Sequence, residues 1–207
     1  MKRKIKEVIR RVFYEGDHQY YQDQQRKKLD LFPEIEIFLQ EKNIKTTLRW
    51  PDRPASSLDW IFDFGEYRSG DYMTSFETVL SISKIVEAYN MCHAFEVSNL
   101  TPQAFTKTIN GSDQMHGFTY PQVELNFHIK KVMKAYGYVR LDYQDMFEKV
   151  PRLRFPHKGR NILGKYIDVD NILFADAMGI GVPDEEDGSL DKLHSFFEQM
   201  GFKKKKE

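Results

Sequence analysis

The hydrophobic residues at the beginning of the chain recur with the spacing of an α-helix. They stand at i, i+3, i+4, i+7 and i+8, in the order Ile5, Val8, Ile9, Val12 and Phe13. This spacing places them on one face of a helix over residues 2–14, whose other face is basic. Further on, Pro33 can begin a second short helix, because proline suits the first helical turn. We expect both helices to dock on a core by their apolar faces.

Two later runs, residues 44–50 and 58–64, alternate between apolar and polar side chains. Alternation is the period of a strand that buries one face, so both runs predict strands. The segment between them contains two prolines and small polar residues that suit a connecting loop, which favours an antiparallel hairpin. Residues 93–99 predict a third strand, with Phe95 and Val97 on one face.

The region between the second and third strands has a helical signature. Thr74 and Glu77 have the spacing of a capping box, and apolar residues continue at helical spacing to Asn90. We therefore expect a helix over residues 74–90. A further helix is expected from Pro121 to just before Gly137, because proline is typical of helix starts and glycine of helix ends.

Shorter elements are expected in the rest of the chain. The pair Asn110-Gly111 predicts a turn after a short strand over 105–109, and residues 138–142 predict a fourth strand or the start of another helix. Residues 149–165 read as a basic loop with prolines and glycines. Ser189 can cap a last helix that ends at Gly201. The sum is an α+β fold: a small antiparallel sheet covered by N- and C-terminal helices in a single domain over 1–202, followed by a disordered basic tail over 203–207.

Charge and cysteine content narrow the function classes. The 207 residues carry 31 Lys and Arg against 31 Asp and Glu, which excludes a partner held by net charge alone but leaves local patches. The lone Cys92 cannot form an intrachain disulfide, which suits a reducing cytoplasm. We read no signal peptide at the N-terminus and no run of about 18 apolar residues that could span a membrane. The prediction is a cytoplasmic protein without a membrane partner.

The sequence contains no signature motif of catalysis, and no cofactor is expected. It has no Walker loop, GxGxxG, HExxH, GxSxG or paired CxxC. His93 is next to Cys92, but neighbours on an extended chain point to opposite faces, so the thiol has no base beside it. We expect Cys92 to be inert. These absences favour a binding protein over an enzyme.

Two carboxylates give a metal site as a weak alternative. Asp63 on the second strand and Glu96 on the third could hold a hard divalent ion such as magnesium. Their spacing resembles the Asp, then Glu-x-Lys arrangement of restriction-like nucleases, which would imply a metal-dependent phosphodiesterase. However, Ser98 stands where the lysine of that arrangement would be.

The basic stretch near residue 155 is a second candidate site. Its cationic side chains could bind phosphate or nucleic acid, because guanidinium groups pair with phosphate oxygens through two hydrogen bonds. The residues are Arg152, Arg154, His157, Lys158 and Arg160. The same side chains would equally suit an acidic protein or a solvated loop.

The third candidate is the segment GEYRSGDYM over residues 65–73. Tyr67, Arg68, Asp71 and Tyr72 fall in it, in an expected loop. Tyrosine and arginine are enriched at interface hot spots because they combine apolar area with directional hydrogen bonds. These four residues are the predicted partner-binding site.

Two function classes result. The favoured one is a non-catalytic protein-binding module of the bacterial cytoplasm, such as an immunity or antitoxin-like inhibitor that covers the active site of a toxin or enzyme encoded nearby. The alternative is a protein that binds nucleic acid or a phosphorylated ligand, as a nuclease or phosphodiesterase if a metal is held by Asp63 and Glu96.

Overall fold

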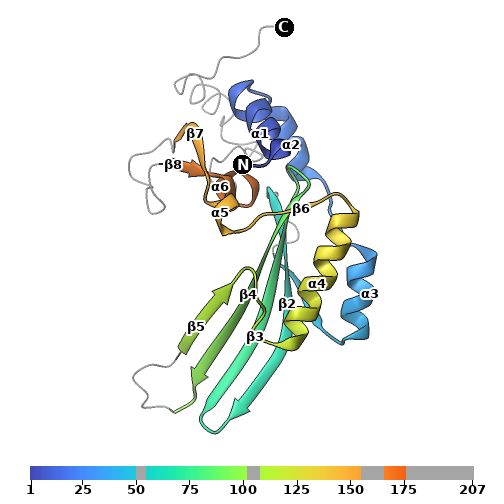
Figure 1. The fold of residues 1–207 in the computed structure, drawn as a ribbon, viewed down its shortest axis with the longest axis vertical. Coiled ribbons are helices and arrows are strands. Elements are labelled where there is room, and N and C mark those ends of the chain that lie inside the picture. The colour runs from blue at the N-terminus through green and yellow to red at the C-terminus, as the bar shows by residue number, and fades with distance from the viewer. Residues whose placement is uncertain (50–54, 102–107, 155–165, 176–207) are drawn as a thin grey trace, which may run out of the picture.

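The computed structural model describes residues 1–49, 55–101, 108–154 and 166–175 (Figure 1). It shows an α+β protein, as the sequence predicts, built on one six-stranded sheet that is antiparallel apart from a single short pairing. Two helices lie along one face of this sheet, and further helices gather at one end of it (Figure 1). The opposite end of the sheet extends beyond the helices.

Five strands of the sheet follow one another in chain order, each antiparallel to the next. They are β1 (Lys45–Arg49), β2 (Ser57–Ser69), β3 (Tyr72–Ser83), β4 (Ala88–Asn99) and β5 (Thr108–Asp113). The sixth, β6 (Val139–Arg140), pairs in parallel with the start of β4. The predicted hairpin of residues 44–50 and 58–64 is confirmed, since Leu48 on β1 lies opposite Trp60 on β2.

Helices α3 (Pro33–Glu41) and α4 (Tyr120–Ala135) cover one face of the sheet and form a core with it. The two predicted helix starts at Pro33 and Pro121 are confirmed within one residue, and Gly137 adopts a positive φ of 77° just after α4 ends. Fully buried side chains of this core come from both layers: Ile35, Leu125, Ile129, Met133, Phe62, Leu80, Ile82 and Met91. Each contributes roughly 1.5–3 kcal/mol by leaving water.

A second core joins the N-terminal helices to the later part of the chain. It packs α1 (Arg3–Ile9), the π-helical turn η1 (Arg10–Tyr14) and α2 (His18–Arg26) against α5 (Tyr143–Met146), β7 (Lys149–Arg154), β8 (Tyr166–Asp168) and α6 (Val169–Leu173). The hydroxyl of Tyr21 donates a hydrogen bond to the carbonyl of Ile172 at 2.6 Å. The expected helix over 2–14 is therefore confirmed, with its last turn π-helical.

The expected helix over residues 74–90 is wrong, because these residues form β3, the turn after it and the start of β4. Phe76, Thr78, Leu80 and Ile82 all point to the helix-covered face, whereas the residues between them point away. Threonine, valine and isoleucine recur in the segment, which also contains phenylalanine, and β-branched and aromatic residues favour strands. The alternation of inward and outward side chains along residues 76–82 therefore indicates the structure correctly, and the capping-box spacing does not.

The expected turn at Asn110-Gly111 is also wrong, because both residues are paired within β5. The expected basic loop starts as strand β7 over its first six residues, and its remainder, 155–165, lies outside the described residues. Residues 138–142 include the expected strand as β6. The expected last helix and the tail over 203–207 lie outside the described residues as well.

In the described part of the chain, no helix has the length and apolar character needed to cross a membrane.

Candidate protein-binding surface

The predicted partner-binding residues lie at the tip of the long β2–β3 hairpin, at the end of the sheet away from the helices (Figure 1). Tyr67 and Arg68 stand near the end of β2, Asp71 is in the turn and Tyr72 begins β3. All four side chains are exposed, with Tyr67 and Tyr72 at 56% and 52% of their full accessible area. The structure thus brings them together on one exposed projection.

The hairpin tip is tighter than the loop that the sequence suggests. Ser69 pairs with Tyr72, which leaves only Gly70 and Asp71 as the turn. Gly70 has a φ of 58°, the pattern of a type II′ turn with glycine at its first central position. The expected loop over 65–73 is therefore wrong outside these two residues, and Tyr67 and Tyr72 are held by strand pairing.

A β-bulge re-aims the end of β2 before the tip. Between Asp63 and Glu66 the strand carries one residue more than β3, and Gly65 has a φ of 85°, which suits glycine. The carboxylate of Asp63 accepts a hydrogen bond from the backbone N–H of Gly65 at 2.7 Å. Beyond the bulge, Tyr67 shares the helix-covered face of the sheet with Phe76.

Aromatic rings continue from the tip across this face. Tyr67 contacts Phe76 edge-on at 5.9 Å between ring centroids, and Phe95 contacts Phe118 edge-on at 4.8 Å. Phe76 and Phe95 are paired across β3 and β4, so the rings lie in one row. We call the exposed and half-exposed residues at this end of the sheet the distal aromatic surface: Tyr67, Tyr72, Phe76, Phe95, Ile109 and Phe118.

Of the residues of this surface, only Tyr67 and Tyr72 are predicted from the sequence as partner-binding residues. The sequence predicts a helix at Phe76 and the end of a short strand at Ile109, and it predicts no element at Phe118. The alternation of residues 72–82 would have placed Tyr72 and Phe76 on one face, had it been preferred to the capping-box spacing.

The two outer strands of the sheet differ in charge. Strand β1 carries Lys45 and Arg49 within five residues, and such charges protect a sheet edge from pairing with other chains. Strand β5 has one charged residue, Asp113, at its end. Among the described residues β5 pairs with β4 alone, and Ile109 on it is 60% exposed. Within the described ranges, the outer edge of β5 therefore has no paired strand beside the distal aromatic surface.

The carboxylates of the metal alternative are not brought together. Asp63 on β2 and Glu96 on β4 are separated by the whole of β3, which corresponds to about 10 Å across two strand spacings. Asp63 stabilises the bulge, and Glu96 accepts a hydrogen bond from the hydroxyl of Ser98 at 3.1 Å. Within the described residues, no group of three or more His, Cys, Asp and Glu could hold a metal ion.

The basic stretch is described only in part. Arg152 is exposed on β7 with a φ of 64°, at an irregularity in its pairing with β8. Arg154 is the last residue of β7 and pairs with Tyr166. His157, Lys158 and Arg160 lie outside the described residues. The phosphate or nucleic-acid site therefore stays a prediction.

Cys92 and His93 point to opposite faces of β4, as expected for neighbours on a strand. Burial raises the pKa of the Cys92 thiol, so the unreactive protonated form is favoured. His93 is fully buried under α4, where its Nδ1 lies 2.8 Å from the hydroxyl of Thr78. Burial, with the positive charge of Arg140, lowers its pKa to about 4. The two side chains cannot act as a nucleophile and its base.

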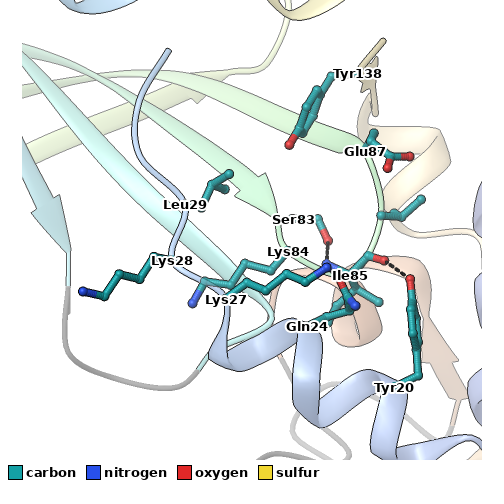
Figure 2. Close-up of a pocket in the computed structure, with 11 residues that line it drawn as sticks. Tyr20, Gln24, Lys27, Lys28, Leu29, Ser83, Lys84, Ile85, Glu87 and Tyr138 are labelled. Atoms are coloured by element: carbon teal, nitrogen blue, oxygen red, sulfur yellow. Dashed lines mark hydrogen bonds between the residues drawn. The ribbon is translucent and has the colours of Figure 1, made fainter. Parts of the chain in front are cut away.

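A small pocket of about 180 Å³ lies between the end of α2 and the β3–β4 turn (Figure 2). Lys84 crosses it and donates a hydrogen bond to the carbonyl of Gln25 at 2.9 Å, next to the C-terminal end of α2, where a cation is favourable. The hydroxyl of Tyr20 donates to the carbonyl of Ile85 at 3.2 Å. These contacts attach α2 to the turn, so the pocket belongs to the scaffold.

Comparisons with models of known protein families, with curated proteins and with solved structures find no match to this chain. The described residues define an α+β protein with an antiparallel meander sheet that has exposed aromatic side chains at one end.

Proposed function

We propose that this protein binds another protein through the distal aromatic surface and acts without chemistry of its own. The observation that carries the proposal is the exposure of Tyr67 and Tyr72 on a hairpin paired up to its tip, next to the half-exposed rings of Phe76 and Phe95. Exposed aromatic side chains on a fixed backbone bind at low entropic cost and dominate interface energies.

The neighbouring polar groups support a protein partner. Arg68 and Asp71 lie between the two tyrosines along the hairpin and supply charges of both signs at its tip. The open edge of β5 offers backbone N–H and C=O groups that an extended segment of a partner could pair with. An inhibitor of the immunity or antitoxin type, acting in the bacterial cytoplasm on a toxin or enzyme encoded nearby, is the form of this function that we favour.

The experiment is affinity capture from the source cell with three forms of the full chain. The wild type should recover a stoichiometric partner, and Tyr67→Ala/Tyr72→Ala should recover at least about tenfold less. Ile37→Ala is the matched control, because Ile37 is 55% exposed on α3, away from the hairpin. Thermal melts of all three establish that each is folded.

Two results would contradict the proposal. One is the absence of any stoichiometric partner, and the other is equal capture by the wild type and the tyrosine variant. Labelled RNA and DNA, titrated at two salt concentrations, test the alternative function: binding that weakens steeply with salt and on Arg152→Ala would favour a nucleic-acid partner.

A further inference from the structure

A second exposed feature, a pocket of about 630 Å³, lies at the other end of β5, between that strand and α5. Cys92 and Ser112 line it from the sheet, and Met146 lines it from α5. Its volume is in the range of clefts that bind small molecules or protruding side chains. The distal aromatic surface does not include any of its residues.

Aromatic rings and a thioether stand at this pocket in exposed positions. Tyr143 and Phe147 are one helical turn apart, with ring centroids separated by 4.4 Å, and are 64% and 47% exposed. Met115, which is 51% exposed, lines the pocket as well. Exposed rings of this kind attract cations through their π-faces.

The polar groups that line the pocket are predominantly acceptors. Asp113 accepts hydrogen bonds from the backbone N–H groups of Met115 and His116, both at 2.6 Å. These bonds lower the pKa of the Asp113 carboxyl, so it is ionised at neutral pH. Asp142 contributes a second carboxylate, which accepts from the backbone N–H of Asp145 at 2.9 Å.

A buried acceptor adds to this set. The side-chain oxygen of Gln114 has no hydrogen-bond partner within the described part of the chain, although it is shielded from solvent. A buried polar atom left without a partner costs free energy, which a donor from a ligand would recover. The described residues that line the pocket include no lysine, arginine or histidine.

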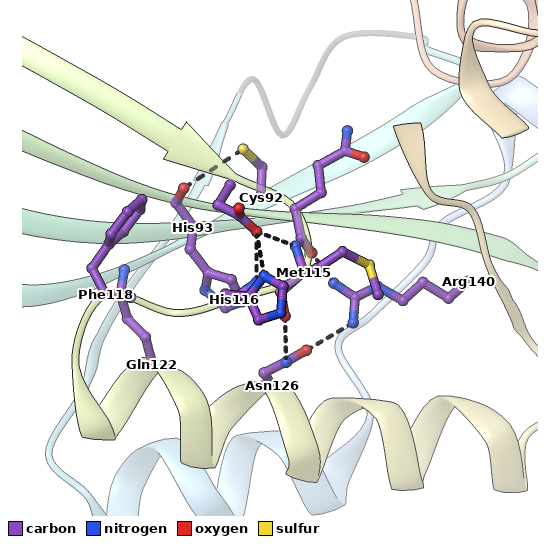
Figure 3. A network of polar contacts seen from close by, with 10 residues as sticks. Cys92, His93, Met115, His116, Phe118, Gln122, Asn126 and Arg140 are labelled. Carbon is purple, nitrogen blue, oxygen red and sulfur yellow. Dashed lines mark hydrogen bonds and ion pairs between the residues drawn. The ribbon is translucent and has the colours of Figure 1, made fainter. Parts of the chain in front are cut away.

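Two basic side chains lie beside these acceptors: His116, whose Nδ1 atom is 3.4 Å from the Asp113 carboxylate, and Arg140. Arg140 donates a hydrogen bond to the side chain of Asn126 at 2.8 Å and another to the backbone carbonyl of Gln114 (Figure 3). Asn126 in turn donates to the carbonyl of Met115 at 3.3 Å. Arg140 thus positions the segment that carries Asp113 and Gln114, and it is not itself one of the residues that line the pocket.

We infer that this pocket receives the guanidinium group of an arginine side chain presented by the protein partner. The inference rests on the proposed function, because it assigns a chemistry to that partner. Guanidinium is planar, stacks on aromatic rings and carries five N–H donors in a fixed fork, so one such group can stack on a ring and donate hydrogen bonds to carboxylates at the same time. The complementarity of charge between Asp113, Asp142 and a cation selects arginine over an apolar side chain.

The test is an NMR titration of the full chain with acetyl-Gly-Arg-Gly-amide, followed through the backbone amides of Ser112, Gln114 and Met115. The matched probe contains citrulline, which has the shape of arginine without the charge. We expect saturable shifts with the arginine peptide and about tenfold weaker binding of the citrulline peptide.

Substitutions at the pocket sharpen the assignment. Asp142→Asn retains a good helix cap, and Tyr143→Leu retains apolar area, so both should leave the fold intact. Each substitution should weaken binding of the arginine peptide by about three- to tenfold. Asp71→Asn at the hairpin tip is the control and should bind as the wild type does.

Three outcomes would overturn the inference: no shifts with the arginine peptide, equal binding of the citrulline peptide, or shifts that neither Asp142→Asn nor Tyr143→Leu alters. Tyr67→Ala/Tyr72→Ala should bind the peptide normally. If the arginine peptide does not bind while partner capture still depends on the two tyrosines, only the pocket assignment is wrong. If the peptide binds while capture shows no such dependence, only the proposed function is wrong.

Discussion

Gly111 on β5 lies directly beneath the ring of Phe95 on the neighbouring strand. An added Cβ at Gly111 would stand 2.6 Å from the Cε1 atom of Phe95, closer than atoms can pack. Because glycine leaves this space free, the ring of Phe95 covers the β5 backbone and reaches Phe118 on the other side. An aromatic ring over a cross-strand glycine is a known means of stabilising such a glycine in a sheet.

Gly111→Ala should therefore displace the ring of Phe95 from Phe118. The unfolding free energy should change by no more than about 1 kcal/mol, since alanine favours a strand over glycine by a similar amount and the ring can rotate away. The measurement is the aromatic NMR shift of Phe118 together with a denaturant melt. Ser112→Ala, at the next and exposed position, is the control and should leave Phe118 unaffected.

The pair also allows a double-mutant cycle. Phe95→Leu and Gly111→Ala, combined, should be more stable than the sum of the single effects by at least about 0.5 kcal/mol, because leucine leaves room for the new methyl group. Strict additivity would show that the two positions are not in contact.

The same contact explains why residues 110 and 111 lie in a strand although their sequence predicts a turn. Asn-Gly is a strong local turn signal, but here the glycine is required by a residue 16 positions earlier in the chain, which no local pattern reveals. The spacing of a capping box is ambiguous in a similar way, because it occurs both on a strand and at a helix start. Thr74 and Glu77 stand on β3, whereas Thr119 and Gln122 form a true capping box at the start of α4.

Features of the fold that depend on interactions between neighbours in sequence could be predicted, whereas those that depend on contacts between distant residues could not. The α3 and α4 starts and the β1–β2 hairpin follow from proline positions and alternation, which are local. Helix α2 is too polar to be recognised: its buried face includes Gln22 and Gln25, which are buried by the tertiary fold. Tyr67 and Tyr72 were found by residue type, but the rings beside them required knowledge of strand pairing.

Gln122 should be among the most sensitive polar positions of the chain. It is fully buried, accepts hydrogen bonds from the backbone N–H groups of Phe118 and Thr119, and donates to the carbonyls of Glu77 and Ala94. It therefore caps α4 and attaches that end of the helix to two strands. Gln122→Ala should lower the unfolding free energy by about 2–4 kcal/mol, as measured by urea denaturation.

A second substitution separates the helix-capping role of Gln122 from its hydrogen bonds to the sheet. Gln122→Glu keeps an oxygen acceptor for the helix cap but loses both N–H donors and buries a charge, so it should be at least as destabilising as Gln122→Ala at neutral pH. Gln19→Ala, at an exposed glutamine of α2, should change stability by less than about 0.5 kcal/mol. A mild effect of Gln122→Glu would mean that the contacts to the sheet contribute little.

Gly70 should be required for its backbone conformation alone. Its φ is 58°, and an added Cβ would meet no atom within 4 Å, so only backbone strain opposes a side chain. Gly70→Ala should cost about 1–2 kcal/mol in a thermal or urea melt. Asp71→Ala, at the next turn position, should cost clearly less, and equal losses from the two variants would argue against the positive φ.

The buried His93 and the half-buried Asp170 should make the unfolding free energy depend on pH in opposite directions. The pKa of His93, lowered to about 4 chiefly by burial, means that the contribution of His93 is fully present above pH 6.5 and is lost as the pH falls toward 4. Burial, reinforced by the charges of Asp168 and Asp59, raises the pKa of the Asp170 carboxyl to about 6. Its contribution is fully present below pH 3.8 and is lost as the pH rises through 6.

Because these two contributions change in opposite directions over the same window, they should largely cancel between pH 4 and 6. Asp170→Asn removes the cost of a half-buried charge, so at pH 7.5 it should raise the unfolding free energy by up to about 3 kcal/mol. In this variant only His93 of the pair still titrates. The unfolding free energy of the variant should therefore fall more steeply than that of the wild type as the pH drops from 6.5 to 4. His93→Gln should do the reverse and become relatively more stable toward pH 4. Urea melts of the three forms at pH 4, 5, 6 and 7.5 measure both slopes, and parallel curves would show that neither group titrates as its burial requires.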